Sequence, residues 1–406
     1  MTRKILLISQ VYAPDPAAVA RLMADVGTEL AARGNEVVVL TADRGYDDPS
    51  VRYEARSVVD GVDIRRLPFC SFGKRSIALR VLGGVSFTLQ AALRALTMRG
   101  LDTMVVSTSP PMAALAAVIV GALRKVRVVY WPMDLNPDQA LALGLASARA
   151  RSVRVFEWVN RAILGRADTV IALDHAMARR LERKRSIAGQ LAIVPPWPEE
   201  DGVDPVPHHE NPFRREHGLD GKTVIMYSGT LGPSNPVDTL LDAAKQFEHD
   251  PRLVFLFVGG GTGMADVRAR HQPNVRCLPY EPLARMRYSL SAGDVQVVSL
   301  GDAMAGIVHP CKVYGAMSTS RPILFLGPDG SHVAEMLSES EFGWHVRHGD
   351  VEGAVTAIRE ILDADQRELQ QLGTRARDCT SSAKIPSAAP QSATTSSRST
   401  RVSGTS

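Results

Sequence analysis

The sequence contains no apolar run long enough to cross a membrane. Its longest apolar stretches, such as residues 112–123, fall short of the ~18 residues that a membrane-spanning helix needs. The first residues, MTRKILLISQVY, lead directly into an apolar run and then reach Pro14, Asp15 and Pro16 without the small-residue cleavage site of an export signal. We therefore expect no spanning helix and no export, and we place the protein in the cytoplasm.

Cysteine is scarce and scattered. Cys70, Cys277, Cys311 and Cys379 are the four cysteines, and their separations match no metal-binding spacing. This pattern predicts reduced thiols and no metal site. The excess of basic over acidic residues is also small, with a net charge of +4, which suits anionic small ligands or lipid headgroups. We predict no nucleic-acid partner.

What the sequence does contain is a repeated alternation of short apolar strands and longer amphipathic stretches. This alternation is typical of βαβ units that build a parallel sheet covered by helices. The 406 residues exceed one ordinary core, so the sequence predicts two doubly wound, Rossmann-like α/β domains that face a central cleft. In the first domain, residues 1–198, we expect strands near 4–9, 36–41, 62–66, 103–107, 127–131, 169–172 and 192–194.

A proline-rich, polar stretch then interrupts the pattern. It begins at Pro195 and reads PPWPEE, and we predict a linker at 199–212. The pattern restarts in a second domain, residues 213–378, with strands near 223–228, 253–258, 275–278, 295–299, 322–326 and 343–346. Residues 379–406 are rich in Ser, Thr, Ala and Pro and are expected to form a disordered tail.

Glycine-rich turns follow the first two strands of the second domain. Gly229 and Gly232 stand between a strand and a helix, where backbone N–H groups can approach a diphosphate. The cluster at residues 259–263 repeats the arrangement, although tight turns without a ligand explain it equally well. The dinucleotide fingerprint that follows the first strand of dehydrogenases is absent, so a dehydrogenase is disfavoured.

Polar residues follow two strands of the first domain. Ser107, Thr108, Asp134, Asn136 and Asp138 stand at strand ends and are predicted to project toward the cleft as substrate ligands. The alternative is that the aspartates only cap turns or the next helix.

The segment GIVHPCKVYGAMSTSRP offers a different kind of site. His309 precedes a short helix that begins near Cys311 and has Lys312 in its first turn. A lysine there opposes the helix dipole, and a bound anion would offset that cost. An exposed lysine that extends to solvent is the simpler alternative.

Several segments, in order, resemble the family-4 GT-B glycosyltransferases, which retain anomeric configuration. YSGTLGPSNPVDTLLDA, FLFVGGGTG, LPYEPLARM and GIVHPCKVYGAMSTSRPILFLGP look like their donor-binding half, and ILLISQVYAPDPAAVARLMADVGTELAARGNEVVVLT resembles their first βαβ unit. The resemblance spans roughly residues 1–375. It implies a nucleotide-diphosphate sugar as donor, retention at the anomeric carbon, no cofactor or obligatory metal, and a glycan or polyprenyl-linked acceptor of the cell envelope.

The resemblance also assigns roles to individual residues. It places Lys312 and the turn at Gly229 and Thr230 against the diphosphate, Pro279 and Tyr280 at the base, and the loop with Gly306, Ile307, Val308 and His309 beside the donor sugar. Taken with the strand-end and glycine-turn patterns, we expect catalytic roles for Asp134, His309 and Lys312. We further expect acceptor contacts for Ser107, Thr108, Asn136 and Asp138 and additional donor contacts for Gly259, Gly260 and Tyr314. The family's paired glutamates are missing, because Ile307 and Gly315 stand at those positions.

Two basic segments lie outside these motifs. Residues 74–99 combine five cations, Lys74 among them, with a broad apolar face, and such a helix can lie in an anionic membrane interface at the inner membrane face. A core-facing helix with solvated arginines explains it equally well. A second cluster is expected to be a solvated face. It consists of Arg179, Arg180, Arg183, Lys184 and Arg185.

The leading hypothesis is therefore a retaining glycosyltransferase. A sugar-nucleotide epimerase on the same two domains and an inactive nucleotide-sugar-binding protein remain as alternatives. Because the helical pattern fades after Arg377, we also expect the two domains to be joined mainly by the linker and to move relative to each other.

Overall fold

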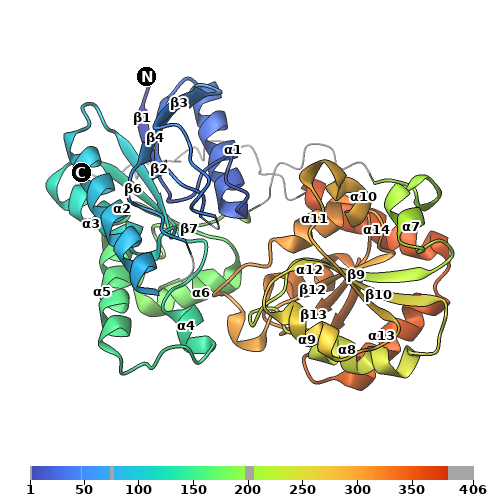
Figure 1. Ribbon diagram of the computed structural model, residues 1–406. Helices are drawn as coiled ribbons and strands as arrows, with labels where there is room; N and C mark the ends of the chain where they lie inside the picture. The colour runs from blue at the N-terminus through green and yellow to red at the C-terminus, as the bar shows by residue number, and fades with distance from the viewer. Residues whose placement is uncertain (1, 47, 74–76, 197–204, 383–406) are drawn as a thin grey trace, which may run out of the picture.

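The protein consists of two α/β domains, seen side by side in Figure 1. The computed structural model describes residues 2–46, 48–73, 77–196 and 205–382. Residues 197–204 of the predicted linker region and residues 383–406 of the predicted tail lie outside the described residues.

The N-terminal domain is built on a sheet of eight strands in the order β3-β4-β2-β1-β5-β6-β7-β8. All neighbours pair in parallel except β3, which runs antiparallel to β4. The strands are β1 Lys4–Ile8, β2 Glu36–Ala42, β3 Arg56–Val59, β4 Val62–Leu67, β5 Thr103–Ser107, β6 Arg127–Trp131, β7 Thr169–Ala172 and β8 Leu191–Ile193. The sequence analysis missed β3, because this edge strand is largely exposed and lacks a buried apolar face.

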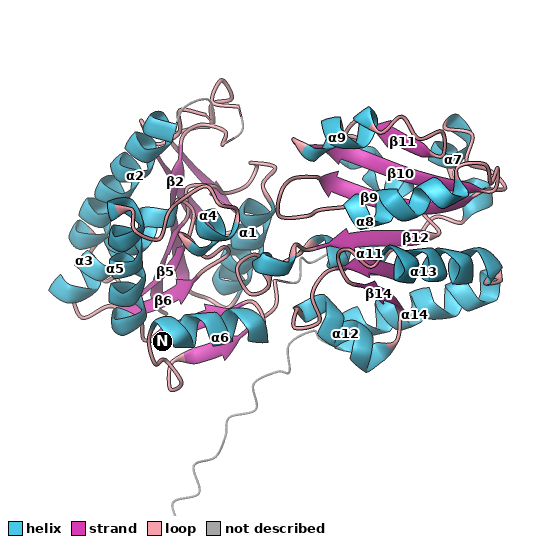
Figure 2. Ribbon diagram, turned by 90° about the horizontal axis from the view of Figure 1, so that it is seen from below, coloured by secondary structure: helices cyan, strands magenta, loops and turns pink. Residues whose placement is uncertain are grey.

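Helices cover this sheet on both faces. α2 packs on α3 and α3 packs on α5, so the three form one layer. This layer lies on the side of the domain turned away from the C-terminal domain (Figures 1 and 2). The helices are α1 Ala18–Ala32, α2 Ile77–Thr97, η1 Pro111–Ala113, α3 Ala114–Leu123, α4 Asp138–Ala142, α5 Arg151–Arg166 and α6 His175–Lys184.

The C-terminal domain contains six parallel strands in the order β11-β10-β9-β12-β13-β14. The strands are β9 Thr223–Thr230, β10 Leu253–Gly260, β11 Val275–Leu278, β12 Val295–Ser299, β13 Ile323–Leu326 and β14 Gly343–Val346. The central strands are almost continuous apolar runs, as expected for parallel strands covered on both faces. Their carboxyl ends point toward the N-terminal domain (Figure 2).

The helical elements of this domain extend beyond both predicted boundaries. They are η2 His208–Glu210, α7 Pro212–Glu216, α8 Asp238–Ala244, η3 Lys245–Phe247, α9 Gly263–Ala269, η4 Leu283–Arg285, α10 Met286–Leu290, η5 Asp302–Met304, α11 Lys312–Ser318, α12 His332–Ser340, α13 Val351–Asp363 and α14 Gln366–Ser382. The predicted linker therefore ends too late, because η2 already belongs to this domain.

The prediction that helix is lost after Arg377 is also wrong, since α14 continues to Ser382. Its side chain Cys379 is half-buried against the apolar cluster that contains Tyr314. A helix whose last turn is polar still forms when one apolar residue of that turn finds a packing partner, and composition alone misses this.

Candidate functional site

The carboxyl ends of β9 and β10 lie against each other and form two tight glycine turns. Gly229 has φ +117° and Gly259 has φ +143°. A Cβ on Gly259 would collide with the carbonyl group of Gly229, and a Cβ on Gly260 would lie 2.6 Å from the Tyr280 ring. Gly259 is required because backbone meets backbone here, and Gly260 leaves room for the Tyr280 ring. The turns predicted from the sequence to bind the donor are thus brought together.

Lys312 extends from the first turn of α11 toward the two glycine turns. Its Nζ donates to the carbonyl oxygen of Thr230 at 2.5 Å and to Tyr227 Oη, and it lies 4.3 Å from the centre of the Tyr227 ring. A Cβ on Gly229 would stand 3.0 Å from Lys312 Cε, so the glycine leaves room for the lysine chain. Sequence reasoning missed Tyr227, whose only signal is its place two residues before Gly229.

The Lys312 ammonium is held among neutral oxygen atoms. Burial lowers the pKa of Lys312 from its ordinary 10.5 to about 8. An anion bound beside Nζ would favour the charged amine and return the pKa toward its ordinary value. The Lys312 ammonium therefore lies at the glycine turns, where an anion can bind beside it.

Tyr280 forms the rim of the same place. Its Oη is 2.6 Å from Thr230 Oγ1, and its ring covers Gly260. Tyr280 and the neighbouring Pro279 are exposed, so a ligand at the turns can reach both. Thr230, Pro279 and Tyr280 thus lie beside the glycine turns, and their contact with a donor stays a prediction.

The loop at residues 305–309 lies elsewhere than predicted. Ile307 is 1% exposed inside the core of the N-terminal domain, and its carbonyl accepts a hydrogen bond of 2.9 Å from the Leu135 N–H. Val308 forms an antiparallel bridge with Asp134. Gly306 has φ +69°, and a Cβ there would stand 2.5 Å from the Ala176 carbonyl. The loop joins the domains, and the predicted donor contact of the Ile307 side chain is wrong.

His309 is part of the same junction. Its Nδ1 lies 2.8 Å from Asp174 Oδ2 of the N-terminal domain, and its Nε2 lies 2.6 Å from Tyr314 Oη. Burial works to raise the pKa of Asp174, but the hydrogen bond and charge of His309 outweigh it and keep that pKa below its ordinary value. With both ring nitrogens engaged, His309 links the two domains, and its catalytic role stays a prediction. Tyr314 is also buried, and its contact with His309 belongs to the same junction.

The sequence analysis did not single out Asp174. Its other carboxylate oxygen accepts a hydrogen bond of 2.7 Å from the Met177 N–H and so caps α6. An aspartate before a helix is ordinarily explained by capping alone, so the sequence carried no sign of its second partner.

Two arginines of the cluster predicted to be solvated instead contact the C-terminal domain. Arg180 donates to the Ala305 carbonyl at 2.6 Å, and Arg179 pairs with Glu335 at 3.6 Å.

Asp134 stands on the N-terminal side of this boundary. Thr108 Oγ1 accepts hydrogen bonds from the Met133 N–H at 3.0 Å and from the Asp134 N–H at 3.3 Å, which positions the loop after β6. Burial raises the pKa of Asp134 to about 6. Its charge acts on the thiol of Cys311, the residue before Lys312. A carboxyl group with a raised pKa therefore faces the segment that carries Lys312.

The other predicted acceptor ligands are engaged elsewhere. Ser107 is fully buried, and its Oγ accepts from the Ser109 N–H at 3.2 Å. Asp138 forms an ion pair of 2.7 Å with Lys184, and the Asn136 carbonyl accepts from Asn160 Nδ2 at 2.7 Å. The structure thus corrects the prediction for Ser107 and Asp138, which hold the fold. Thr108 acts through the Asp134 loop.

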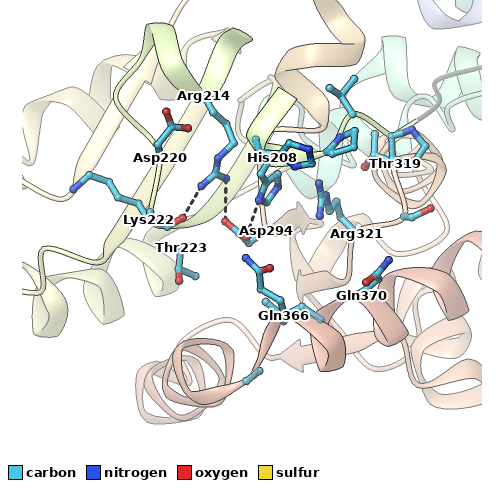
Figure 3. Close-up of a pocket in the computed structure, with 18 residues that line it drawn as sticks. His208, Arg214, Asp220, Lys222, Thr223, Asp294, Thr319, Arg321, Gln366 and Gln370 are labelled. Carbon is cyan, nitrogen blue, oxygen red and sulfur yellow. Dashed lines mark hydrogen bonds and ion pairs between the residues drawn. The ribbon is translucent and has the colours of Figure 1, made fainter. Parts of the chain in front are cut away.

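A large cavity of about 910 Å³ lies at the opposite end of the C-terminal sheet (Figure 3). Arg214 crosses it to pair with Asp294 at 3.2 Å and donates to the Lys222 carbonyl, and His208 also approaches Asp294, at 3.4 Å. Burial lowers the pKa of His208 to about 4, so the imidazole is neutral. These charges are matched within the protein, and the cavity is separate from the glycine turns.

No group of three or more His, Cys, Asp or Glu side chains suited to a metal ion occurs among the described residues. Within that same part of the chain, the helices are too short or too polar to cross a membrane.

Comparisons with known proteins agree with this architecture. The family described as "Glycosyl transferase 4-like domain" matches residues 18–197, and "Glycosyl transferases group 1" matches residues 222–364. The probable glycosyltransferase WbjE of Pseudomonas aeruginosa is 24% identical over 77% of this chain and 79% of its own. The putative colanic acid biosynthesis glycosyl transferase WcaI of Escherichia coli is 25% identical over 76% and 80%.

A solved structure has the same fold. HepE of Anabaena, crystallised with UDP and glucose, superposes with a TM-score of 0.68 over 94% of this chain and 95% of its own, at 16% identity. The predicted architecture of two facing α/β domains is confirmed.

Proposed function

The chain belongs to the GT-B glycosyltransferases of the family-4 type, and from this premise we propose that it transfers a sugar from a nucleotide-diphosphate sugar to a glycan or polyprenyl-linked acceptor with retention of anomeric configuration. The observation that carries the donor assignment is Lys312. A buried cation that forms no ion pair among the described residues, set against two glycine turns, fits the diphosphate of such a donor. The UDP bound by HepE supports this class of ligand.

In the proposed reaction the departing diphosphate carries the developing negative charge. Lys312 stabilises that charge, and backbone N–H groups of the turn at Gly229 can approach it because no side chain intervenes. The acceptor hydroxyl passes its proton to the departing oxygen on the same face of the sugar, which retains the configuration. Asp134 orients the acceptor from the other domain, and no step requires a metal or cofactor.

The acceptor assignment rests on the polysaccharide role in the name of the WcaI relative. The proposal places the protein in the cytoplasm, where its four cysteines, all unpaired in the structure, would remain reduced.

A donor panel followed by product analysis tests the proposal. Thermal shifts with UDP-, GDP- and dTDP-sugars identify the base, and NMR of the product formed on a lipid-linked or glycan acceptor reports the anomeric configuration. Retention with EDTA present is the expected outcome. Inversion, or an epimerised donor formed without acceptor, contradicts it. Donor binding without turnover on any acceptor would favour an inactive binding protein, in keeping with Ile307 and Gly315 at the positions of the family's glutamates.

A further inference from the structure

Helix α2 buries its small residues together with Phe87 and exposes most of its leucines. Leu89 and Leu93 are 60% and 64% exposed, and they continue a stripe with Leu82 and Val85. The opposite side packs inward through residues such as Gly83, Gly84, Ala91 and Ala95. A Cβ on Gly83 would stand 2.8 Å from the Cys70 carbonyl, so this side lies directly on backbone. A helix that only served the core would turn its leucines the other way.

A second group of exposed apolar side chains lies on α5. Trp158 is 61% exposed and Val155 lies one turn away on the same side of that helix. Because α2, α3 and α5 form one layer over the sheet, their outer sides make a common surface on the far side of the domain (Figures 1 and 2). We call Leu82, Val85, Leu89, Leu93, Val155 and Trp158 the α2–α5 surface.

The charge around this surface is of one sign. Helices α2, α3 and α5 carry six arginines and a single glutamate, Glu157. That glutamate binds Lys184 of α6 at 2.5 Å. The exposed Arg80 and Arg94 flank the α2 stripe, and Arg154 and Arg161 flank Trp158. Lys74 and Arg75, which also entered the sequence-based expectation, lie outside the described residues.

We propose that the α2–α5 surface rests on an anionic phospholipid bilayer. The leucines and valines enter the boundary between headgroups and acyl chains, the arginines meet lipid phosphates, and Trp158 lies at headgroup depth, where its amphipathic ring is favoured. A second copy of this chain is a poor occupant, because it would set two arginine-rich surfaces against each other. The surface lies apart from the glycine turns, so the proposal does not depend on the transfer reaction.

Vesicle sedimentation with the full chain tests this. The wild type is expected to sediment with vesicles containing phosphatidylglycerol and to bind pure phosphatidylcholine weakly, with the difference shrinking at high salt. The triple variant Leu82→Gln, Leu89→Gln, Leu93→Gln should lose binding by about tenfold or more. The control Val58→Gln, Val59→Gln alters two exposed valines of β3 in the same domain and should stay within about twofold of the wild type.

A second readout needs no altered leucine. Tryptophan emission should shift to the blue when anionic vesicles are added, and Trp158→Phe should abolish the shift while binding persists. Wild-type protein that ignores anionic vesicles, or a triple variant that binds as well as the wild type, overturns the proposal. A wild-type dimer in light scattering that the triple variant converts to monomer would assign the surface to a second copy and also overturn it.

Discussion

At the scale of single residues, the two groups most relevant to chemistry are Lys312 and Asp134, and burial shifts the pKa of each toward neutrality. They stand on different domains, one beside the glycine turns and one on the loop after β6. A lysine that remains charged despite burial is costly unless an anion joins it, and a buried carboxyl group is costly unless it takes up a proton. Both costs are typical of a binding site rather than of a structural core.

Lys312→Ala is expected to weaken donor binding by about 1.5–3 kcal/mol, the range for a hydrogen bond to a charged group. Because the pKa of Lys312 is about 8 without a ligand and a bound anion raises it, wild-type donor affinity should fall as the pH rises above about 8. Calorimetry below and above that pH measures both effects. Lys245→Ala removes an exposed lysine of the same domain and serves as the control. Unchanged affinity in Lys312→Ala would remove this lysine from the donor site.

Asp134→Asn should lower turnover by about a hundredfold and leave donor affinity nearly intact, because Asp134 faces the donor half from the other domain. The pKa of about 6 lies above the ordinary value, so the folded protein binds the proton more tightly than the unfolded chain, and stability contributed by the protonated form is lost as pH rises from about 4 to 6. The neutral asparagine should therefore melt no earlier than the wild type at pH 7. Normal kinetics with earlier melting would mark Asp134 as a structural cap.

At the scale of elements, the loop that enters α11 decides how the two domains meet. Residues 305–309 place Ile307 in the opposite core and tie His309 to Asp174, and Arg180 holds the Ala305 carbonyl. The expectation that the linker provides the main connection is therefore wrong for the described residues. The loop that was predicted to face the donor forms a junction because the apolar side chain of Ile307 is buried in the core of the N-terminal domain.

Gly306→Ala tests that junction. The change adds a methyl group 2.5 Å from the Ala176 carbonyl at a residue with φ +69°, so it should cost backbone strain of about 1 kcal/mol plus the separation of the domains. Gly349→Ala is the matched control, because Gly349 has φ +85° and open space around it. We expect a larger drop in melting temperature for Gly306→Ala than for Gly349→Ala, with increased protease cleavage near residue 200. Equal drops would mean that the contact at Ala176 adds nothing.

At the scale of the whole molecule, the two sheets, their junction and the last helix form a single architecture with the donor turns facing the other domain. Helix α14 packs on α11, the helix that carries Lys312, and on α12. The end of the chain therefore stabilises the element that holds the donor-site lysine.

Two truncations separate the helix from the segment after it. Ending the chain after Ser382 should leave melting temperature and donor binding unchanged, because residues 383–406 offer almost no large apolar side chain to bury. Ending it after Arg377 removes the half-buried Cys379 and the last turn of α14, and should cost about 1–2 kcal/mol in thermal or urea unfolding. A large loss of stability in the protein that ends after Ser382 would show that residues 383–406 dock on the rest of the protein.

The sequence by itself determined most of the secondary structure and the position of the glycine turns. Three strands occur at the predicted bounds, namely Thr103–Ser107, Arg127–Trp131 and Val275–Leu278. Their bounds could be predicted because a run of buried apolar residues that ends in turn-forming residues is a local property of the sequence. Glycines at 229 and 259 and the lysine at 312 could be recognised for the same reason.

Only the tertiary structure decided which partners these elements meet. The sequence carried no sign that the two ring nitrogens of His309 are hydrogen-bonded to Asp174 and Tyr314, residues 135 positions before it and 5 after it. Helix α2 has two faces in the sequence, and only its packing shows that most of its leucines point outward. Periodicity records that a helix has faces, whereas the side that is covered depends on neighbours distant in the chain.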